Sequence, residues 1–364
     1  FVTLFFISLL LFLLGSGVWV ALSMIAVSAI GMMLFTTRPV GDAMATTIWG
    51  TSSSWTLTAL PLFVWMGEIL FRTKLSENLF KGLSPWLSKL PGGLIHVNVV
   101  GCGLFAAISG SSAATVATVG KMSIPELRKR KYPEKILLGS LAGSGTLGLL
   151  IPPSIILIIY GVTIEDSIAK LFMAGIFPGI MLAVIFMLYI VVWSIINKKL
   201  MPKISENFSF IEKIKRSKQL LPVVLLIFAV IGSIYTGIAT ATEAASLGVV
   251  GALVLSLFQG TLNKNSFKLS LLGATKTSCM IAFILAGSTF LSLAMGFTGL
   301  PRNLAIWIQE LNLSPYMLIF ILTIFYIILG MFLDGISAVV LTMAIIEPMI
   351  RQAGFDMIWF GIYL

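Results

Sequence analysis

Charged residues are scarce in this sequence: Asp, Glu, Lys and Arg make up only 10% of its 364 residues. An average soluble domain contains about 25%. Hydrophobic residues reach 58%, and the mean hydropathy is +1.05. A soluble fold of this length could not bury so much apolar surface, and the remainder would face its solvent. The composition therefore excludes an ordinary soluble protein and indicates that lipid surrounds much of the chain.

Histidine and cysteine are also rare, with His96, Cys102 and Cys279 as the only examples. Their spacing suggests neither a metal site nor a disulfide framework. The lone histidine has no sequence context for a Ser/His/Asp set, and no phosphate-binding GxxxxGK[ST] loop is present. We therefore expect a protein that is not an enzyme, has no cofactor and does not hydrolyse ATP itself.

Long apolar runs are what the chain has instead. A transmembrane helix needs roughly 20 apolar residues. Runs of that size occupy 1–35, 43–71, 94–119, 136–164, 171–196, 221–260, 277–300 and 315–350. Because they are continuous rather than alternating, they favour helices over a closed barrel. We predict an all-α polytopic membrane protein with about 9 to 11 membrane-embedded elements.

Basic residues gather in three connecting segments. Residues 121–135 hold six Lys or Arg against two Glu, residues 197–219 hold seven against two, and residues 261–276 hold three and no acid. Two crossings separate each cluster from the next, so all three lie on one side, which is cytoplasmic by the positive-inside rule. We interpret the net charge of +10 as topology rather than a nucleic-acid site. The connection 197–219 divides a first half, 1–196, from a second half, 220–364.

Small polar residues interrupt the first half at the stretch from Ser109 to Thr115. Glycine costs about 1 kcal/mol relative to alanine in a helix, and serine hydroxyls compete for the backbone. We predict a re-entrant hairpin over 94–135 with its turn at membrane depth. Such a turn could offer hydroxyls and carbonyls to sodium and N–H groups to a carboxylate. Close helix packing is the alternative interpretation.

A second interruption lies between Gly143 and Ser154 and contains Pro152-Pro153. Two prolines remove two amide donors, and the glycines before them loosen the same place. We predict a broken helix over 136–164 whose freed carbonyls, from about Ser144 to Leu150, could bind a cation. A structural kink is the alternative. The site residues predicted from these two stretches are Ser109, Gly110, Ser111, Ser112, Thr115, Ser144, Gly145, Thr146, Gly148, Pro152, Pro153 and Ser154.

The third place is a turn that follows an uncharged run, within a second predicted hairpin over 315–353. A carboxylate inside a membrane run costs at least about 2.5 kcal/mol and usually faces an ion or substrate path. An N-cap for the returning helix is the alternative for Asp334. Its predicted site residues are Gly330, Asp334, Gly335 and Ser337. The predicted sodium ligands are Ser109, Ser112, Gly145, Gly148 and Asp334.

Two further acidic residues have structural interpretations. Glu243 begins an apolar run and could simply cap it. Glu68 and Arg72, four residues apart, could pair along one helix. A weak internal repeat supports two halves: Gly-x-Ser-Ala occurs at Gly110 and again at Gly335, and each copy leads to a proline.

Several strings together resemble a known family. They are GSSAATVATVGKMSIPEL at 110–127, GLLIPPSIILIIYG at 148–161 and SIAKLFMAGIFPGI at 167–180, followed by TEAA at 242–245, Gly-Leu-Pro at 299–301, GMFLD at 330–334 and Gly-Phe-Asp at 354–356. The chain resembles the large membrane subunit of the tripartite ATP-independent periplasmic (TRAP) transporters, within the ion transporter superfamily. The resemblance covers most of the chain.

This resemblance implies two inverted repeats, each with a re-entrant hairpin and a broken helix, and an elevator-type mechanism coupled to sodium. It also implies a small four-helix membrane subunit, separate or fused, and a periplasmic substrate-binding protein. The substrate would be a small carboxylate, such as sialic acid or a C4-dicarboxylate, carried across the bacterial inner membrane. By the same symmetry, a second Gly/Pro break would fall just beyond residue 364, so we expect the natural protein to continue there.

The sequence departs from the family pattern in one further place, where Ala241 replaces the proline that often precedes TEAA. This change affects the start of a helix rather than the predicted chemistry. Two other functions remain open at this point. A channel would favour a symmetric oligomer with a ring of carbonyls or charges. A membrane receptor or scaffold would give no reason for Asp334 or for the Gly/Pro breaks.

Overall fold

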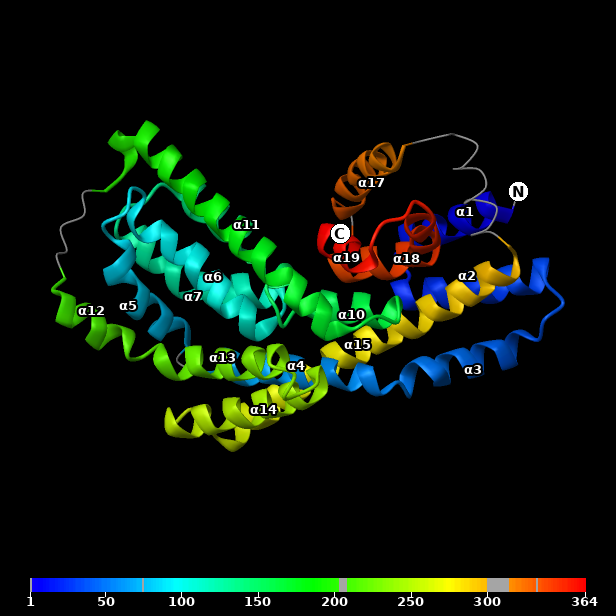
Figure 1. Ribbon diagram of the computed structural model, residues 1–364, viewed down its shortest axis with the longest axis horizontal. Helices are drawn as coiled ribbons and strands as arrows, with labels where there is room; N and C mark the ends of the chain where they lie inside the picture. The colour runs from blue at the N-terminus through cyan, green and yellow to red at the C-terminus, as the bar shows by residue number, and fades with distance from the viewer. Residues whose placement is uncertain (1, 74, 203–207, 300–313, 332) are drawn as a thin grey trace. The chain divides into compact units, whose positions relative to one another are not determined.

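The computed structural model describes residues 2–73, 75–202, 208–299, 314–331 and 333–364 (Figure 1). Leu300 and Pro301 of the family-like string lie outside these ranges. The described residues are largely helical and contain no β-strand. The helices of the first half are α1 (Val2–Gly15), α2 (Val20–Phe35), α3 (Val40–Ser52), η1 (Trp55–Thr58), α4 (Ala59–Phe71), α5 (Leu75–Leu87), η2 (Gly93–Ile95), α6 (His96–Ser109), α7 (Ser112–Lys129), α8 (Glu134–Gly145), α9 (Leu147–Leu150), α10 (Ile155–Thr163) and α11 (Ile168–Ile196).

The basic connection and the second half follow the same pattern. Their helices are η3 (Lys198–Leu200), α12 (Phe210–Ser217), α13 (Leu221–Tyr235), α14 (Ala241–Phe258), α15 (Lys264–Phe297), α17 (Pro315–Gly330), α18 (Gly335–Gln352) and α19 (Met357–Tyr363). The all-α prediction is confirmed. Polar caps start several of these helices, because the first backbone N–H groups of a helix have no partner within it. Thr240, Ser314, Asp334 and Asp356 each accept a hydrogen bond from a backbone N–H three residues ahead.

Length and composition identify the elements that can cross a membrane. Among the described residues, five helices qualify, and seven if each of two bent helix pairs is one span. The described residues also include four shorter apolar helices: Leu4–Gly15, Val20–Phe35, Gly93–Ser109 and Pro315–Gly330. The predicted number of embedded elements is therefore reached only if the short helices are embedded too. One of the short ones, at Gly93–Ser109, forms the first arm of the predicted hairpin.

The chain forms two compact units. Unit 1 comprises Phe1–Leu57, Ile158–Ser167 and Thr277–Leu364, and unit 2 comprises Thr58–Leu157 and Ile168–Lys276. The helices α10 and α15 each contribute to both. This division interleaves the chain, whereas the predicted halves 1–196 and 220–364 follow a sequence repeat. The inverted repeat therefore stays a prediction.

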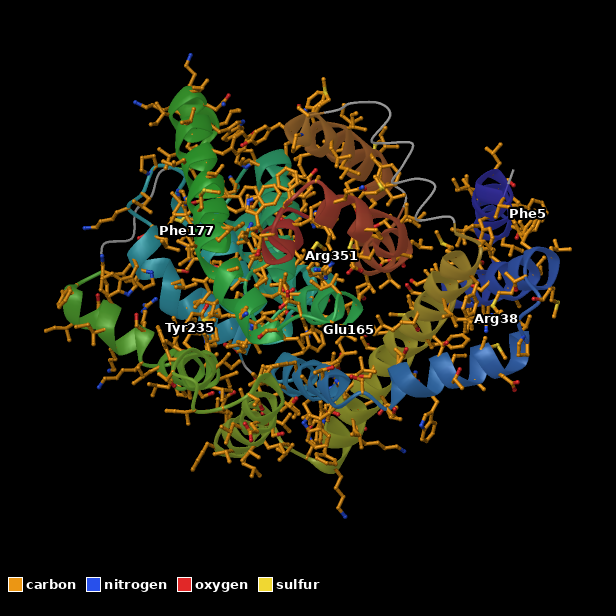
Figure 2. The ribbon with its side chains drawn as sticks, turned by 45° about the vertical axis from the view of Figure 1, so that its right-hand side comes forward. Phe5, Arg38, Glu165, Phe177, Tyr235 and Arg351 are labelled. Carbon is orange, nitrogen blue, oxygen red and sulfur yellow. The ribbon has the colours of Figure 1, made fainter. Side chains whose placement is uncertain are left out.

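Unit 2 is built around α6. The helices α5, α7, α8, α9 and α11 all pack on α6, while α4 packs on both α6 and α14. Its buried core includes Ile95, Val99, Ala106, Leu137 and Leu147, from α6, α8, α9 and the short η2. By contrast, large apolar side chains on α11 remain exposed: Phe177, labelled in Figure 2, is 76% exposed. This distribution is expected of a protein whose outer surface faces lipid rather than water.

Unit 1 is held by contacts between segments far apart in the sequence. The Tyr160 hydroxyl donates to the carbonyl of Met357 at 2.6 Å, and Gly361 lies against the same ring, where a Cβ would not fit. The hydroxyl of Thr51 donates to that of Thr289 at 2.9 Å, and Ser288 donates to the carbonyl of Val340 at 2.7 Å. Hydroxyls that bridge helices in this way satisfy polar groups that lipid cannot.

Candidate functional site

The predicted first turn joins α6 to α7 through two residues. The helix α6 ends at Ser109, Gly110 has a φ of 58°, and Ser111 caps α7 from an extended conformation. Glycine suits Gly110 because a side chain is strained at positive φ. The Ser111 hydroxyl accepts a hydrogen bond from the N–H of Ala114 at 3.5 Å. The result is a helix–turn–helix hairpin with a sharp reversal.

The hydroxyls of this turn bind one another and the local backbone. The Oγ of Ser109 lies 3.0 Å from the Oγ1 of Thr115, and that Oγ1 donates to the carbonyl of Ser111 at 2.7 Å. Ser109 and Thr115 are buried, while Ser111 and Ser112 are half-buried. The oxygen atoms are therefore held in place by the turn itself.

The second predicted interruption is confirmed as a break between α9 and α10. Residues 151–154 are not helical, and Pro152, Pro153 and Ser154 are all buried. A proline cannot donate the backbone bond that a continuing helix needs. Ser154 replaces part of the lost bonding, because its hydroxyl donates to the carbonyl of Leu149.

The position of the break bears on the carbonyls between Ser144 and Leu150 that the sequence predicts to be free. The helix α8 continues to Gly145 and α9 to Leu150, whereas Pro152 and Pro153 cannot donate to the carbonyls of Gly148 and Leu149 one turn earlier. The carbonyl of Ser144 accepts from the N–H of Thr146, and that of Leu147 accepts from the N–H of Ile151 at 2.8 Å. The chain stays helical here because glycine weakens a helix without removing its donors, unlike proline. A carbonyl that already accepts one bond retains a second lone pair.

The hairpin turn and the interrupted helix touch directly. The N–H of Ile155 donates to the carbonyl of Gly110 at 3.2 Å. A Cβ on Gly110 would lie 2.6 Å from the carbonyl oxygen of Pro153. A Cβ on Gly148 would lie 2.8 Å from the carbonyl oxygen of Ser111 and 3.0 Å from the nitrogen of Ser112. Both glycines are therefore required for close backbone contact, and the two predicted stretches form one cluster in unit 2.

Asn98 supports this cluster and was not among the predicted site residues. Its Nδ2 donates to the Oγ of Ser140 at 3.0 Å, and its backbone carbonyl accepts from the Oγ of Ser144 at 3.3 Å. Asn98 is fully buried, and its Oδ1 has no hydrogen-bond partner. A buried amide in an apolar run is the signal that could have identified it, because buried polar groups normally pair.

The second predicted turn lies in unit 1, between α17 and α18. Asp334 is exposed and accepts a bond from the N–H of Ser337 at 3.3 Å, so the N-cap interpretation is confirmed. Ser337 is buried, Gly335 opens α18, and a Cβ on Gly330 would meet no atom within 4 Å. Near this turn, the Tyr326 hydroxyl binds that of Thr342 at 2.8 Å across α17 and α18.

The oxygen donors at both turns suit a hard cation. No group of three or more His, Cys, Asp or Glu that could hold a metal occurs in the described part of the chain. The donors that the turns supply are hydroxyls, backbone carbonyls and, at the second turn, the Asp334 carboxylate. Oxygen ligands of this kind favour ions such as sodium over soft transition metals.

Comparison with known proteins identifies the family. The model of the tripartite ATP-independent periplasmic transporter, DctM component, matches residues 6–364. The chain belongs to this family. It is 33% identical over 338 residues to the C4-dicarboxylate TRAP transporter large permease protein DctM of Pseudomonas aeruginosa, covering 92% of this chain and 78% of that protein.

Two other TRAP relatives carry different substrate names. The chain is 30% identical to the isethionate TRAP transporter permease protein DctMQ of Oleidesulfovibrio alaskensis, covering 89% of this chain and 51% of that protein. It is 29% identical to the sialic acid TRAP transporter large permease protein SiaM of Vibrio cholerae, covering 96% and 81%. Membership of the TRAP family makes the chain a membrane transport component, and the alternatives of a channel or a receptor are thereby set aside.

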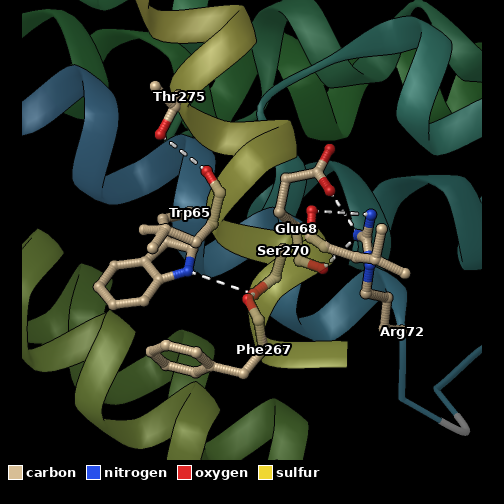
Figure 3. A network of polar contacts seen from close by, with 8 residues as sticks. Trp65, Glu68, Arg72, Phe267, Ser270 and Thr275 are labelled. Carbon is tan, nitrogen blue, oxygen red and sulfur yellow. Dashed lines mark hydrogen bonds and ion pairs between the residues drawn. The ribbon is translucent and has the colours of Figure 1, made fainter. Parts of the chain in front are cut away.

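The two further acidic residues of this TRAP permease, Glu243 and Glu68, have structural roles. Glu243 and Thr240 form a reciprocal capping box at the start of α14, as the cap interpretation predicted. Glu68 pairs with Arg72 on α4, and Arg72 also donates to the carbonyl of Leu269 at 3.2 Å (Figure 3). A Cβ on Gly273 would collide with the Glu68 carboxylate. The pair therefore ties α4 to α15.

His96 is enclosed by the protein in unit 2. It is fully buried at the start of α6, where its Nε2 lies 2.8 Å from the carbonyl of Pro91. The preceding Gly92, with a φ of 103°, bends the chain around the ring. His96 thus helps to hold the entrance of the first hairpin.

Proposed function

We propose that this chain is the large transmembrane subunit of a secondary transporter that imports a small organic acid together with sodium. The observation that carries the proposal is the direct contact between a helical turn and an interrupted helix, both rich in hydroxyls. Non-helical backbone at membrane depth is stable only where protein, ions or substrate satisfy it. Such backbone also forms the ion and substrate sites of many transporters.

The sodium ligands in this proposal are assigned to each turn separately. Ser109 and Ser112 would supply oxygens from the first hairpin, and Gly145 and Gly148 would supply carbonyls from the helix packed against it. The close approach of Gly148 to Ser111 and Ser112 supports this grouping. Asp334 would supply the one carboxylate, at the second turn. The candidate site residues would belong to an elevator-type transporter built from two inverted repeats.

The substrate in this proposal is a small anion, most simply a carboxylate. The relatives are named for C4-dicarboxylates, sialic acid and isethionate, each of which carries a carboxylate or sulfonate. The helices α7 and α18 begin beside the two turns, and helix N-termini favour negative charge. The acidic groups that these named substrates share support an acidic substrate for this chain. Uptake measurements with individual acids would identify which one.

The transporter would work as an assembly in the bacterial inner membrane. A periplasmic binding protein would deliver the substrate, and a small four-helix membrane subunit would complete the permease. The name DctMQ, for a relative about twice as long as the matched region, supports a fused arrangement in some members. The basic segments 121–135, 197–219 and 261–276 would then face the cytoplasm.

Uptake by proteoliposomes tests this function. The permease is reconstituted with its small subunit and binding protein, and labelled acid is followed with and without an inward sodium gradient. Uptake should require the gradient, and Ser112→Ala and Asp334→Asn should each weaken the sodium dependence. Asp356→Asn is the matched control, because Asp356 also caps a helix, at 2.8 Å from the N–H of Trp359. Uptake that ignores sodium would refute the coupling.

A further inference from the structure

The helix α12 carries an exposed apolar face beside a dense group of cations. Its sequence is Phe-Ile-Glu-Lys-Ile-Lys-Arg-Ser. Phe210, Ile211 and Ile214 are 66%, 75% and 44% exposed. At 100° per residue these three fall within an arc of about 100°, Lys213 and Lys215 flank that arc, and Arg216 lies opposite it. An amphipathic helix with its apolar side uncovered is typical of a membrane interface.

This helix is fixed in place by unit 2. The Nε1 of Trp86, on α5, donates to the Oγ of Ser217 at 2.7 Å, and that hydroxyl donates to the carbonyl of Gly82 at 3.3 Å. The ring of Trp86 also packs edge-on against Phe210, with 6.2 Å between ring centroids. Contacts with α5 therefore fix the orientation of α12 and of its exposed apolar face.

The angle to the next helix supports an orientation along the membrane surface. The axes of α12 and α13 differ by 59°. The two helices pass the length and composition test for a crossing only as a bent pair, to which α13 contributes an apolar helix of 15 residues. With α13 as the crossing part of the pair, its tilt would be about 20°, the average for transmembrane helices. The axis of α12 then lies roughly 40–80° from the bilayer normal. A helix at that angle can lay its apolar side into the headgroup region.

The charges select among the lipids that form this surface. Lys213, Lys215, Arg216 and Lys218 fall within six residues, and Glu212 is the only acid between 208 and 220. The carboxylate of Glu212 accepts from the N–H of Ser209 at 2.9 Å, in a capping box. Lys215, Arg216 and Lys218 are exposed, and the Nζ of Lys213 lies 5.3 Å from the Trp86 ring centroid. Clusters of this kind beside a crossing helix bind anionic headgroups.

We propose that α12, together with Trp86, forms a binding surface for anionic phospholipids of the leaflet that α13 enters. In this arrangement Phe210, Ile211 and Ile214 lie at the acyl boundary, and the cations bind headgroup phosphates. This interaction is independent of sodium and of the transported acid. It gives the basic connection a physical role in addition to setting topology.

Fluorescence quenching in lipid nanodiscs tests the proposal on the full chain. Cys279 is exposed and is replaced by serine, while Cys102 is buried and stays. A bimane label on Ile211→Cys is then measured with brominated acyl chains in phosphatidylglycerol or in phosphatidylcholine. Strong quenching is expected in both lipids at low salt, with at least about twofold more in phosphatidylglycerol, and this difference should shrink at high salt.

Charge variants complete the test. Replacing Lys213, Lys215, Arg216 and Lys218 by glutamine should abolish the phosphatidylglycerol preference. The matched control replaces Lys264, Lys268 and Lys276, in another basic segment, and should retain it. Should the fourfold variant fail to fold, Lys215→Gln and Lys218→Gln singly, both at exposed positions, should each reduce the preference.

Two results would overturn the proposal. Equal quenching in both lipids at every salt concentration would mean that α12 does not select anionic headgroups. Absence of quenching would mean that another protein surface, rather than lipid, covers Ile211.

Discussion

Two consecutive spans of the chain respond differently to proline. The helix α11 contains Pro178 and yet continues unbroken for 29 residues. The preceding span, Glu134–Thr163, is interrupted where Pro152 and Pro153 stand. In the most apolar window of each, 17% of α11 is buried, against 67% of the preceding span. The broken helix is thus the buried one, and the continuous helix faces outward.

The two spans differ because their free backbone polar groups find different hydrogen-bond partners. A single proline removes one donor, which a helix facing lipid can tolerate. A true break leaves several polar groups, and these are stable only against protein. Beside the break, the carbonyl of Gly110 accepts a hydrogen bond from the N–H of Ile155. The break therefore depends on the hairpin turn as much as on its own prolines.

Removing the close backbone contact should have the largest effect. In Gly148→Ala, the new Cβ would meet the backbone of Ser111 and Ser112, so the turn and the helix must separate. We expect a loss of about 1–3 kcal/mol in the free energy of unfolding and a fall in uptake of more than about tenfold. Gly139→Ala is the control, because nothing lies within 4 Å of that Cβ. Thermal unfolding and uptake are measured for both, and equal effects would contradict the contact.

Replacing the two prolines of the break should have the second-largest effect. In Pro152→Ala/Pro153→Ala, two N–H donors return and the break can become helical. The carbonyl geometry near the turn would then change, and we expect apparent sodium affinity to fall about tenfold, equivalent to about 1.4 kcal/mol. Pro178→Ala in α11 should change it by less than about 0.5 kcal/mol. Sodium titration of uptake separates the two, and similar affinities in both variants would remove the break from the mechanism.

The smallest effect is expected for the supporting amide. Asn98→Ala removes the bonds from its Nδ2 to the Oγ of Ser140 and the carbonyl of Leu137, and should lower the free energy of unfolding by about 1 kcal/mol. The Nδ2 of Asn197, at the end of α11, donates to the carbonyl of Trp193 one turn earlier. Asn197→Ala should cost less than about 0.5 kcal/mol. Chemical unfolding in detergent compares the variants, and an unaltered Asn98→Ala midpoint would show that this amide does not stabilise the cluster.

Particular residues show how much could be predicted from sequence. Apolar runs long enough to cross a bilayer indicate a helical membrane protein, because only lipid tolerates that composition. Proline and glycine mark the break and the turn, since their backbone chemistry is local. The caps at Asp334 and Glu243 are equally local. Asn98 was not predicted from the sequence, because the role of an amide depends on which carbonyls and hydroxyls surround it in the fold.

The sequence by itself determined the membrane class, the family and the places where helices stop, because these depend on composition and on neighbouring residues. Only the tertiary structure decided which spans are buried and which backbone atoms meet. Gly110 and Ile155 are 45 positions apart, and their hydrogen bond depends on α6, α8 and α9 packing together. Hydropathy cannot distinguish α11 from the span before it, since a buried helix and a lipid-facing helix are both apolar.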